Sequence, residues 1–496
     1  MIEAGRWLWD IRTPMRDGVE LSVDLHLPPD GLAGGPYPAV LVRTAAGNQN
    51  AALVTQARGL ADAGFAVALQ DVRGREDSDG TFAPFRDEGP DGYDTVEWVA
   101  AQDWCTGKVG MMGSGYAGWT QWAAAAEKPP HLTALASASP WSPGPAGLPG
   151  TLSLERLAWL HAMSARVWQE AGAVDWEAAL RHLPLRDAAS ATGSRLPFWE
   201  QWLDEPESWR SLEIEAADVP VLHVTDWPSA GLLRHVPDEV VVVGEPDLEA
   251  LHKDWFTHWL KDPSHERPSS RCFVTGTNAW REEAWQPAEG NASWFLGGDG
   301  TLTTSPGDGG ANSYRYDPDD PVLLTTDLTF FPSAPKTRTP LPADRRFLER
   351  RPDVLTYTSE AASESLELEG MPTARLLVSS DRTDTDFFVQ LSDVAPSGPS
   401  LVLASGGLRA RSREGTDREV FLVPGEVTAL SIELSALAHV LLPGHRLRLA
   451  VTSSWFPLAD RNLNTGGPVG SETEPLVATN TVHHGSAVVL PVRSAS

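Results

Sequence analysis

The segment 108–119, KVGMMGSGYAGW, carries the clearest chemical signal in the chain, because an apolar strand pattern runs through glycines into a helix pattern. Such a sharp turn, a nucleophile elbow, lifts its central side chain above the sheet and lets the following N–H stabilise an oxyanion. The turn is so tight that the positions two before and two after its centre must hold small residues. Gly115 satisfies this requirement, since Gly113 and Ala117 stand at those positions. The spacing therefore predicts a residue without a side chain at the centre of the turn.

Ser114 is the nearest residue that could act as a nucleophile in this turn. A turn centred on Ser114 would place the large side chains of Met112 and Tyr116 at the two cramped positions. The sequence therefore favours a small turn residue over a nucleophile at position 114.

The segments around this turn alternate between strand and helix patterns. Strand patterns occur at YPAVLVRT and FAVALQD, and helix patterns at GYDTVEWVAAQ and AGWTQWAAAAE. This alternation is typical of a parallel sheet with helices on both faces. Helical patterns with scattered tryptophans follow between about 141 and 218, after which VPVLHVTDW and EVVVVGE return to strands. From about residue 269, short alternating strands separated by turn residues predict a β-sandwich.

The composition argues against proteins that bind nucleic acids or membranes. The 496 residues include 39 Lys and Arg against 67 Asp and Glu, a formal net charge of −28. Such a charge repels phosphate backbones and anionic lipids, so we expect no nucleic-acid partner and no membrane partner. The N-terminal sequence lacks a signal-peptide pattern, which favours a cytoplasmic location. Two cysteines outside any CxxC pair, and no metal-binding motif, lead us to expect neither a metal nor another cofactor.

Several segments resemble the cocaine esterase and X-Pro dipeptidyl-peptidase family of serine hydrolases, namely 70–75 (QDVRGR), 85–94 (FRDEGPDGYD) and 110–118 (GMMGSGYAG). The C-terminal jelly roll of that family is matched by the later segments 380–387, 422–426 and 460–466. The resemblance implies an α/β fold class with three parts. These would be an α/β-hydrolase domain at 1–140 and 217–268, a helical cap at 141–216 and a jelly-roll β-sandwich at 269–496.

The resemblance also implies four catalytic positions, and none of them carries the family's residue in this chain. The serine nucleophile corresponds to Gly115, and the oxyanion tyrosine corresponds to Ala46. The acid corresponds to Ser229, and the histidine base to Leu248. Because loss of the nucleophile alone lowers the rate of a triad enzyme by about a millionfold, we expect no working Ser-Asp-His triad.

The preferred interpretation is a catalytically degenerate member of this family that binds a small apolar ligand in the former acyl pocket. We expect it to catalyse a non-hydrolytic reaction, that is a cyclisation, an isomerisation or an elimination. Asp226 and Asp247 follow consecutive predicted strands, so they are the candidate acid/base residues. Contacts with the ligand are expected from residues of the turn, the cap and the strand ends, namely Ala46, Gly115, Tyr116, Trp141, Trp227, Ser229 and Leu248.

Two alternatives stay open at this point. The first is an active ester or peptide hydrolase with a displaced triad of Ser114, Asp226 and His252, which keeps the family's order of residues. The second is a non-catalytic binding or scaffold protein. A small molecule is the expected partner in the preferred interpretation, and a homo-oligomer is compatible with all three.

Overall fold

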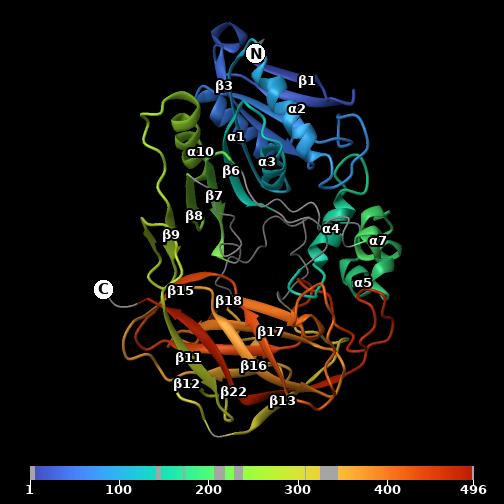
Figure 1. Ribbon diagram of the computed structural model, residues 1–496, viewed down its shortest axis with the longest axis vertical. Helices are drawn as coiled ribbons and strands as arrows, with labels where there is room; N and C mark the ends of the chain where they lie inside the picture. Colours follow the sequence, from blue (N-terminus) through green and yellow to red (C-terminus); the bar gives the residue numbers. More distant parts are fainter. Residues whose placement is uncertain are drawn as a thin grey trace.

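The structure, a computed structural model, describes residues 6–140, 144, 147–170, 172, 174–205, 218–227, 238–307, 309–323 and 344–493. Its elements form a mixed α/β body around one large sheet and a β-rich body from the C-terminal part of the chain (Figure 1). Short helices lie beside both bodies on one side of the molecule (Figure 1). The predicted fold class, an α/β-hydrolase domain followed by a β-rich domain, is therefore confirmed.

The α/β body contains a ten-stranded sheet in the order β1-β2-β4-β3-β5-β6-β7-β8-β9-β10. The central strands from β3 to β9 are parallel, whereas β1, β2 and β10 pair antiparallel at the two edges. The strands span Trp7–Pro14 (β1), Glu20–His26 (β2), Tyr37–Thr44 (β3), Ala66–Asp71 (β4), Cys105–Gly115 (β5), Leu132–Pro140 (β6), Val221–Thr225 (β7), Glu239–Val243 (β8), Arg271–Val274 (β9) and Ala279–Arg281 (β10).

Helices cover both faces of this sheet, as the sequence predicts. They span Ala51–Asp62 (α1), Glu88–Ala100 (α2), Tyr116–Ala126 (α3) and Leu248–Phe256 (α10), which continues into a π-helical turn at Thr257–Lys261, and a 3-10 turn lies at Gly31–Gly34. Successive residues of a strand point to opposite faces. Ala39 and Leu41 of β3 accordingly pack with α2 and α3, whereas Val40 and Val42 pack with α1 and α10.

Among the described residues between β6 and β7 there are four short helices, namely Leu154–Ala162 (α4), Trp176–Arg181 (α5), Ala188–Thr192 (α6) and Pro197–Asp204 (α7), with a 3-10 turn at Leu185–Asp187. They agree with the helical patterns in this part of the sequence. Trp159 and Trp199 are buried in one apolar cluster with Phe85 and Tyr116 of the α/β body. These tryptophans therefore stabilise the contact between the short helices and the α/β body.

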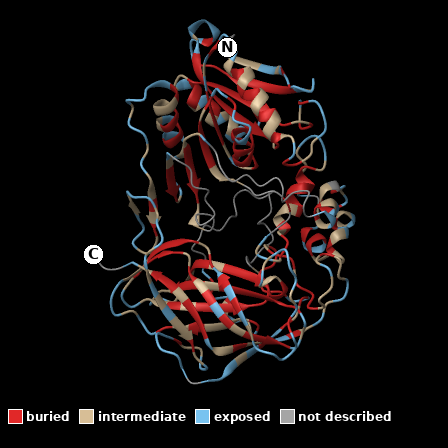
Figure 2. Ribbon diagram, in the orientation of Figure 1, coloured by how far each residue is buried: buried red, intermediate tan, exposed pale blue. Residues whose placement is uncertain are grey.

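The β-rich body contains an eight-stranded and a four-stranded sheet, and its apolar core draws residues from both. The larger sheet runs β12-β11-β22-β15-β20, with β13, β16 and β19 attached, and the smaller runs β14-β21-β17-β18. The interior positions of these strands are buried (Figure 2). The strands span Gly290–Leu296 (β11), Leu302–Thr303 (β12), Ala311–Tyr316 (β13), Leu355–Thr358 (β14), Leu366–Gly370 (β15), Thr373–Ser380 (β16), Asp386–Val394 (β17), Ser400–Arg409 (β18), Thr428–Glu433 (β19), Leu437–Leu441 (β20), Arg446–Thr452 (β21) and Ala478–Val492 (β22), with 3-10 turns at Leu348–Arg350 and Ala410–Ser412.

Cys105 and Cys272 are both free and buried. In the described part of the chain, no helix combines the length and the apolar character that crossing a bilayer requires.

Candidate functional site

The turn between β5 and α3 has the backbone of a nucleophile elbow centred on Gly115. Gly115 has φ 57° and ψ −118°, a conformation that suits glycine and strains other residues. A Cβ atom on Gly113 would lie 2.6 Å from the carbonyl oxygen of Ala117 and 2.7 Å from its Cβ. The two positions expected to be cramped are therefore in direct contact, which fixes the centre of the turn at Gly115.

Ser114 precedes this centre and is exposed. Within the described residues, its hydroxyl makes no hydrogen bond to an imidazole. His252, its partner in the displaced triad, is buried, and its Nε2 has no hydrogen-bond partner there.

Tyr116 begins α3, and its side chain is buried beneath the turn. Its phenol donates to Glu88 Oε1 at 2.7 Å and accepts from the N–H of Phe85 at 3.1 Å. Its ring stacks on Trp159, with ring centroids 5.4 Å apart. Burial raises the pKa of Glu88, although Arg43 lies 3.0 Å from its other oxygen. The Tyr116 side chain therefore stabilises the elbow by packing and by hydrogen bonds. Its backbone N–H directly follows Gly115 in the chain.

The loop after β3 carries Ala46, which is partly buried. The Ala46 N–H donates to Thr44 Oγ1 at 3.0 Å. The carbonyl of Ala45 accepts from Arg75 Nε at 2.9 Å, and the N–H of Asn48 donates to Asp71 at 2.7 Å. The loop is thus held by buried polar groups, and the one amide donor at Ala46 is already engaged within the loop.

Asp226 follows β7 and is partly buried, as is its neighbour Trp227. The indole N–H of Trp227 donates to the carbonyl of Phe273 at 3.0 Å, and its ring packs edge-on against Trp285. Trp227 therefore has a structural role at the end of the sheet. Trp141 and Ser229 lie outside the described residues.

Asp247 and Leu248 form the start of α10 after β8. The Asp247 side chain is exposed and caps the helix by accepting from the N–H of Ala250 at 3.1 Å. Leu248 is partly buried against the apolar cluster between α10 and the sheet. Of the two candidate acid/base residues, Asp247 is therefore the one that serves as a helix cap.

His252 lies one turn into α10 and is 6% exposed. Burial lowers the pKa of His252 to about 4 from 6.5, so the folded protein favours the neutral imidazole. Above pH 6.5 the imidazole is neutral in both the folded and the unfolded protein, and its burial does not reduce stability. As the pH falls from 6.5 towards 4, the unfolded chain takes up a proton that the folded protein does not, so the folded protein loses stability.

We expect His252→Leu to reduce the acid sensitivity of the protein, because leucine has no proton to take up. Between about pH 7 and about pH 5 the natural protein should lose about 2 kcal/mol more stability than the variant. Urea unfolding at the two pH values measures this difference. Equal losses in both proteins would show that burial of His252 does not oppose its protonation.

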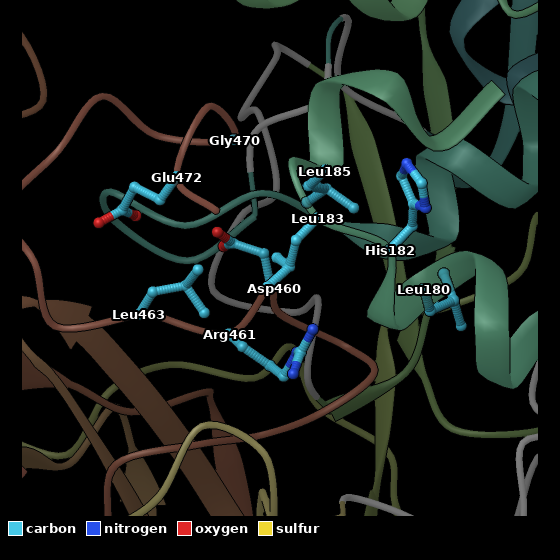
Figure 3. Close-up of a pocket in the computed structure, with 9 residues that line it drawn as sticks. All are labelled: Leu180, His182, Leu183, Leu185, Asp460, Arg461, Leu463, Gly470 and Glu472. Atoms are coloured by element: carbon cyan, nitrogen blue, oxygen red, sulfur yellow. The ribbon is translucent and has the colours of Figure 1, made fainter. Parts of the chain in front are cut away.

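A pocket lies where the short helices meet loops of the β-rich body (Figure 3). Its charged side chains already have protein partners. Asp460 accepts from the N–H of Leu152 at 2.7 Å, and Arg461 donates to the carbonyl of Arg181 at 2.7 Å. None of the residues predicted for the functional site lines it, so it belongs to the contact between the two parts of the chain.

Comparison with known proteins gives matches along most of the chain. Residues 17–252 match the family model of the X-Pro dipeptidyl-peptidase (S15 family), and residues 264–489 match that of the X-Pro dipeptidyl-peptidase C-terminal non-catalytic domain. The cocaine esterase of Rhodococcus sp. (strain MB1 Bresler) is 33% identical over 575 aligned positions, covering 97% of this chain and 98% of the relative.

Two solved structures share the fold over nearly their whole length. An aminopeptidase from a marine sediment archaeon, Thaumarchaeota archaeon, has a TM-score of 0.87 at 24% identity, covering 100% of this chain and 97% of that one. An alpha-amino acid ester hydrolase has a TM-score of 0.86 at 24% identity, covering 99% of this chain and 98% of that one.

Proposed function

Because this chain belongs to the cocaine esterase and X-Pro dipeptidyl-peptidase family of hydrolases, we propose that it binds a small, largely apolar molecule at the elbow and acts on it without an acyl-enzyme. The observation that carries this proposal is the backbone of Gly115, which has the geometry of the elbow's centre. An acyl-enzyme needs an oxygen or sulfur atom at that place, and glycine offers only a hydrogen.

The surroundings of Gly115 support a ligand site of apolar character. Ala46 and Leu248 stand where the resemblance implies the oxyanion tyrosine and the base, and neither side chain can donate or accept a hydrogen bond. The displaced triad is the less favoured alternative, since Ser114 is exposed while His252 is buried in the core of the α/β body.

Asp226 is the acid/base residue that we assign to a non-hydrolytic step. It follows a central parallel strand, and ligands of open α/β sheets bind at the carboxyl ends of such strands. In an isomerisation the carboxyl group moves a proton from one atom of the ligand to another, and in a cyclisation it transfers the proton of the ligand group that attacks another part of the same ligand. In an elimination the carboxylate removes a proton, the C–H electron pair forms the new π bond, and the ligand's leaving group departs with its bonding pair. None of these reactions needs an acyl-enzyme or a water nucleophile.

The absence of an acyl-enzyme is tested with a fluorophosphonate and with p-nitrophenyl butyrate. We expect no fluorophosphonate adduct in the intact mass of the natural protein. Ester turnover should remain at the uncatalysed rate and be unchanged by Ser114→Ala. An adduct on Ser114, or turnover that Ser114→Ala abolishes, would show that the displaced triad is active and would overturn the proposal.

The apolar site is tested with cysteine probes, because both natural cysteines are buried. We expect Gly115→Cys to react faster with N-phenylmaleimide than with iodoacetamide, by about tenfold after normalisation to glutathione. A tenfold difference in rate corresponds to about 1.4 kcal/mol, which is less than the free energy gained by burying an aromatic ring completely. Ser114→Cys is the matched control on the exposed side of the same turn and should show no preference. Equal preference in the two variants would contradict an apolar site above Gly115.

A further inference from the structure

Asp71 ends β4 and lies beside the loop that connects β3 to α1, whose Ala45 packs in the same apolar cluster as Tyr116 of the elbow. Its side chain is fully buried. One carboxyl oxygen accepts from the N–H of Asn48 at 2.7 Å. The other oxygen is buried and has no hydrogen-bond partner in the described part of the chain. A buried carboxylate oxygen without a hydrogen-bond partner costs free energy, so burial at this place favours the neutral form of Asp71 over the ionised form.

The same loop is held from its other side by Arg75, which is also fully buried. Arg75 Nε donates to the carbonyl of Ala45 at 2.9 Å, and its Nη1 donates to the carbonyl of Met163 at 3.3 Å, just after α4. The loop 44–48 is therefore fixed by one carboxyl group and one guanidinium, and Ala46 lies between the two attachment points.

The charges that face Asp71 are mostly of its own sign. Burial raises the pKa of Asp71 to about 7, and the nearby carboxylates of Glu76 and Asp24 act in the same direction. The N–H groups of Asn48 and Asp77 oppose the shift. The positive charge of Arg75 also lies close.

We propose that Asp71 is a positioning residue: when protonated it holds the loop 44–48 closed beside the elbow, and when ionised it favours opening of that loop. A neutral carboxyl group accepts the Asn48 N–H without burying a charge. An ionised Asp71 gains hydration only if the loop moves away. The consequence for ligand access past Ala46 rests on the proposed function, whereas the movement of the loop does not.

The expected size of the effect follows from proton linkage. We take the hydrated Asp71 of the open loop to have the ordinary aspartate pKa of 3.8, against about 7 in the closed loop, so opening should release a proton at pH values between the two. The closed loop is thus most favoured below pH 3.8 and loses that advantage as the pH rises through 7. The opening equilibrium should rise about 50-fold between about pH 5 and about pH 7, and by about twofold or less from there to about pH 8.

Hydrogen exchange of the natural protein without any ligand measures this opening. We expect the exchange rate of the peptide covering residues 44–50 to rise with pH by the predicted factor, after correction for the intrinsic pH dependence of exchange. Asp71→Asn keeps an acceptor for the Asn48 N–H and cannot ionise, so its opening should be independent of pH. Asp24→Asn tests the second carboxyl group that contacts this segment, since Asp24 is buried in the same sheet and accepts from the side-chain amide of Gln49. The pH dependence of opening should persist in this variant.

Two results would overturn the proposal: a pH-independent opening in the natural protein, or the same pH dependence in Asp71→Asn. Loss of the pH dependence in Asp24→Asn with its retention in Asp71→Asn would assign the effect to Asp24 and reject it for Asp71. Because no ligand is used, these outcomes are distinct from failure of the cysteine-probe and ester experiments, which concern the elbow itself.

Discussion

Gly113→Ala is expected to destabilise the α/β body by about 3 kcal/mol, because the elbow leaves no room for a methyl group at this position. The added Cβ would lie 2.6 Å from the carbonyl oxygen of Ala117 and 2.7 Å from its Cβ. Both groups belong to the first turn of α3, so relief requires that the helix shift away from β5. Urea unfolding followed by tryptophan fluorescence measures the loss, since Trp119 and Trp122 of α3 are buried.

Gly307→Ala is the matched control for this substitution. No atom lies within 4 Å of the position that its Cβ would take, so the change should alter stability by less than about 1 kcal/mol. If Gly113→Ala were as stable as Gly307→Ala, the elbow could relax around position 113. The assignment of Gly115 as its centre would then lose its steric basis.

The centre of the elbow could be predicted from the sequence because its requirement is local. Small residues are needed at fixed distances along the chain, and Gly113 and Ala117 meet that need only for Gly115. The sheet with helices on both faces was predictable for a similar reason. Continuous apolar strands such as that of β3 can be buried only between two layers of helices.

The partners of the candidate site residues were not predictable, because they depend on contacts between distant segments. Tyr116 reaches Glu88, 28 positions away, and Trp227 reaches Phe273, 46 positions away. Neither pair has a sequence signal. The burial of His252 has no such signal either, since a histidine near the start of a helix with many charged residues is expected to be solvated.

The capping role of Asp247, in contrast, has a clear signal in the sequence. An aspartate directly before an amphipathic helix is a favoured N-cap, and Asp247 immediately precedes the pattern of α10. This local signal is enough to separate Asp247 from Asp226 as a candidate acid/base residue.

Two of the segments that resemble the family's jelly roll, 380–387 and 460–466, contribute the carboxylates of a buried ionic network around Arg409. Arg409 is 1% exposed and donates to both carboxyl oxygens of Asp386, at 2.9 and 3.0 Å. It also donates to Asp460 at 3.1 Å, and the other oxygen of Asp460 accepts from the N–H of Leu152. The network therefore joins the β-rich body to the segment that leads into α4.

Arg409→Met is expected to destabilise the protein by about 3–5 kcal/mol, because it leaves two buried carboxylates without their shared cation. The loss of the guanidinium should also weaken the contact with the segment before α4, since Asp460 then repels Asp386 across the vacated space. Urea unfolding measures the stability, and limited proteolysis between residues 147 and 160 reports the loosened contact.

Two further variants separate the loss of charge balance from the loss of a large side chain. Arg418→Met removes an exposed arginine of the same body, 71% accessible at its side chain, and should change stability by less than about 0.5 kcal/mol. Adding Asp386→Asn to Arg409→Met removes one uncompensated charge while Asn462 keeps an acceptor, so part of the lost stability should return. If the double variant were no more stable than Arg409→Met alone, the cost would arise from the cavity, and the buried charges would not be its cause.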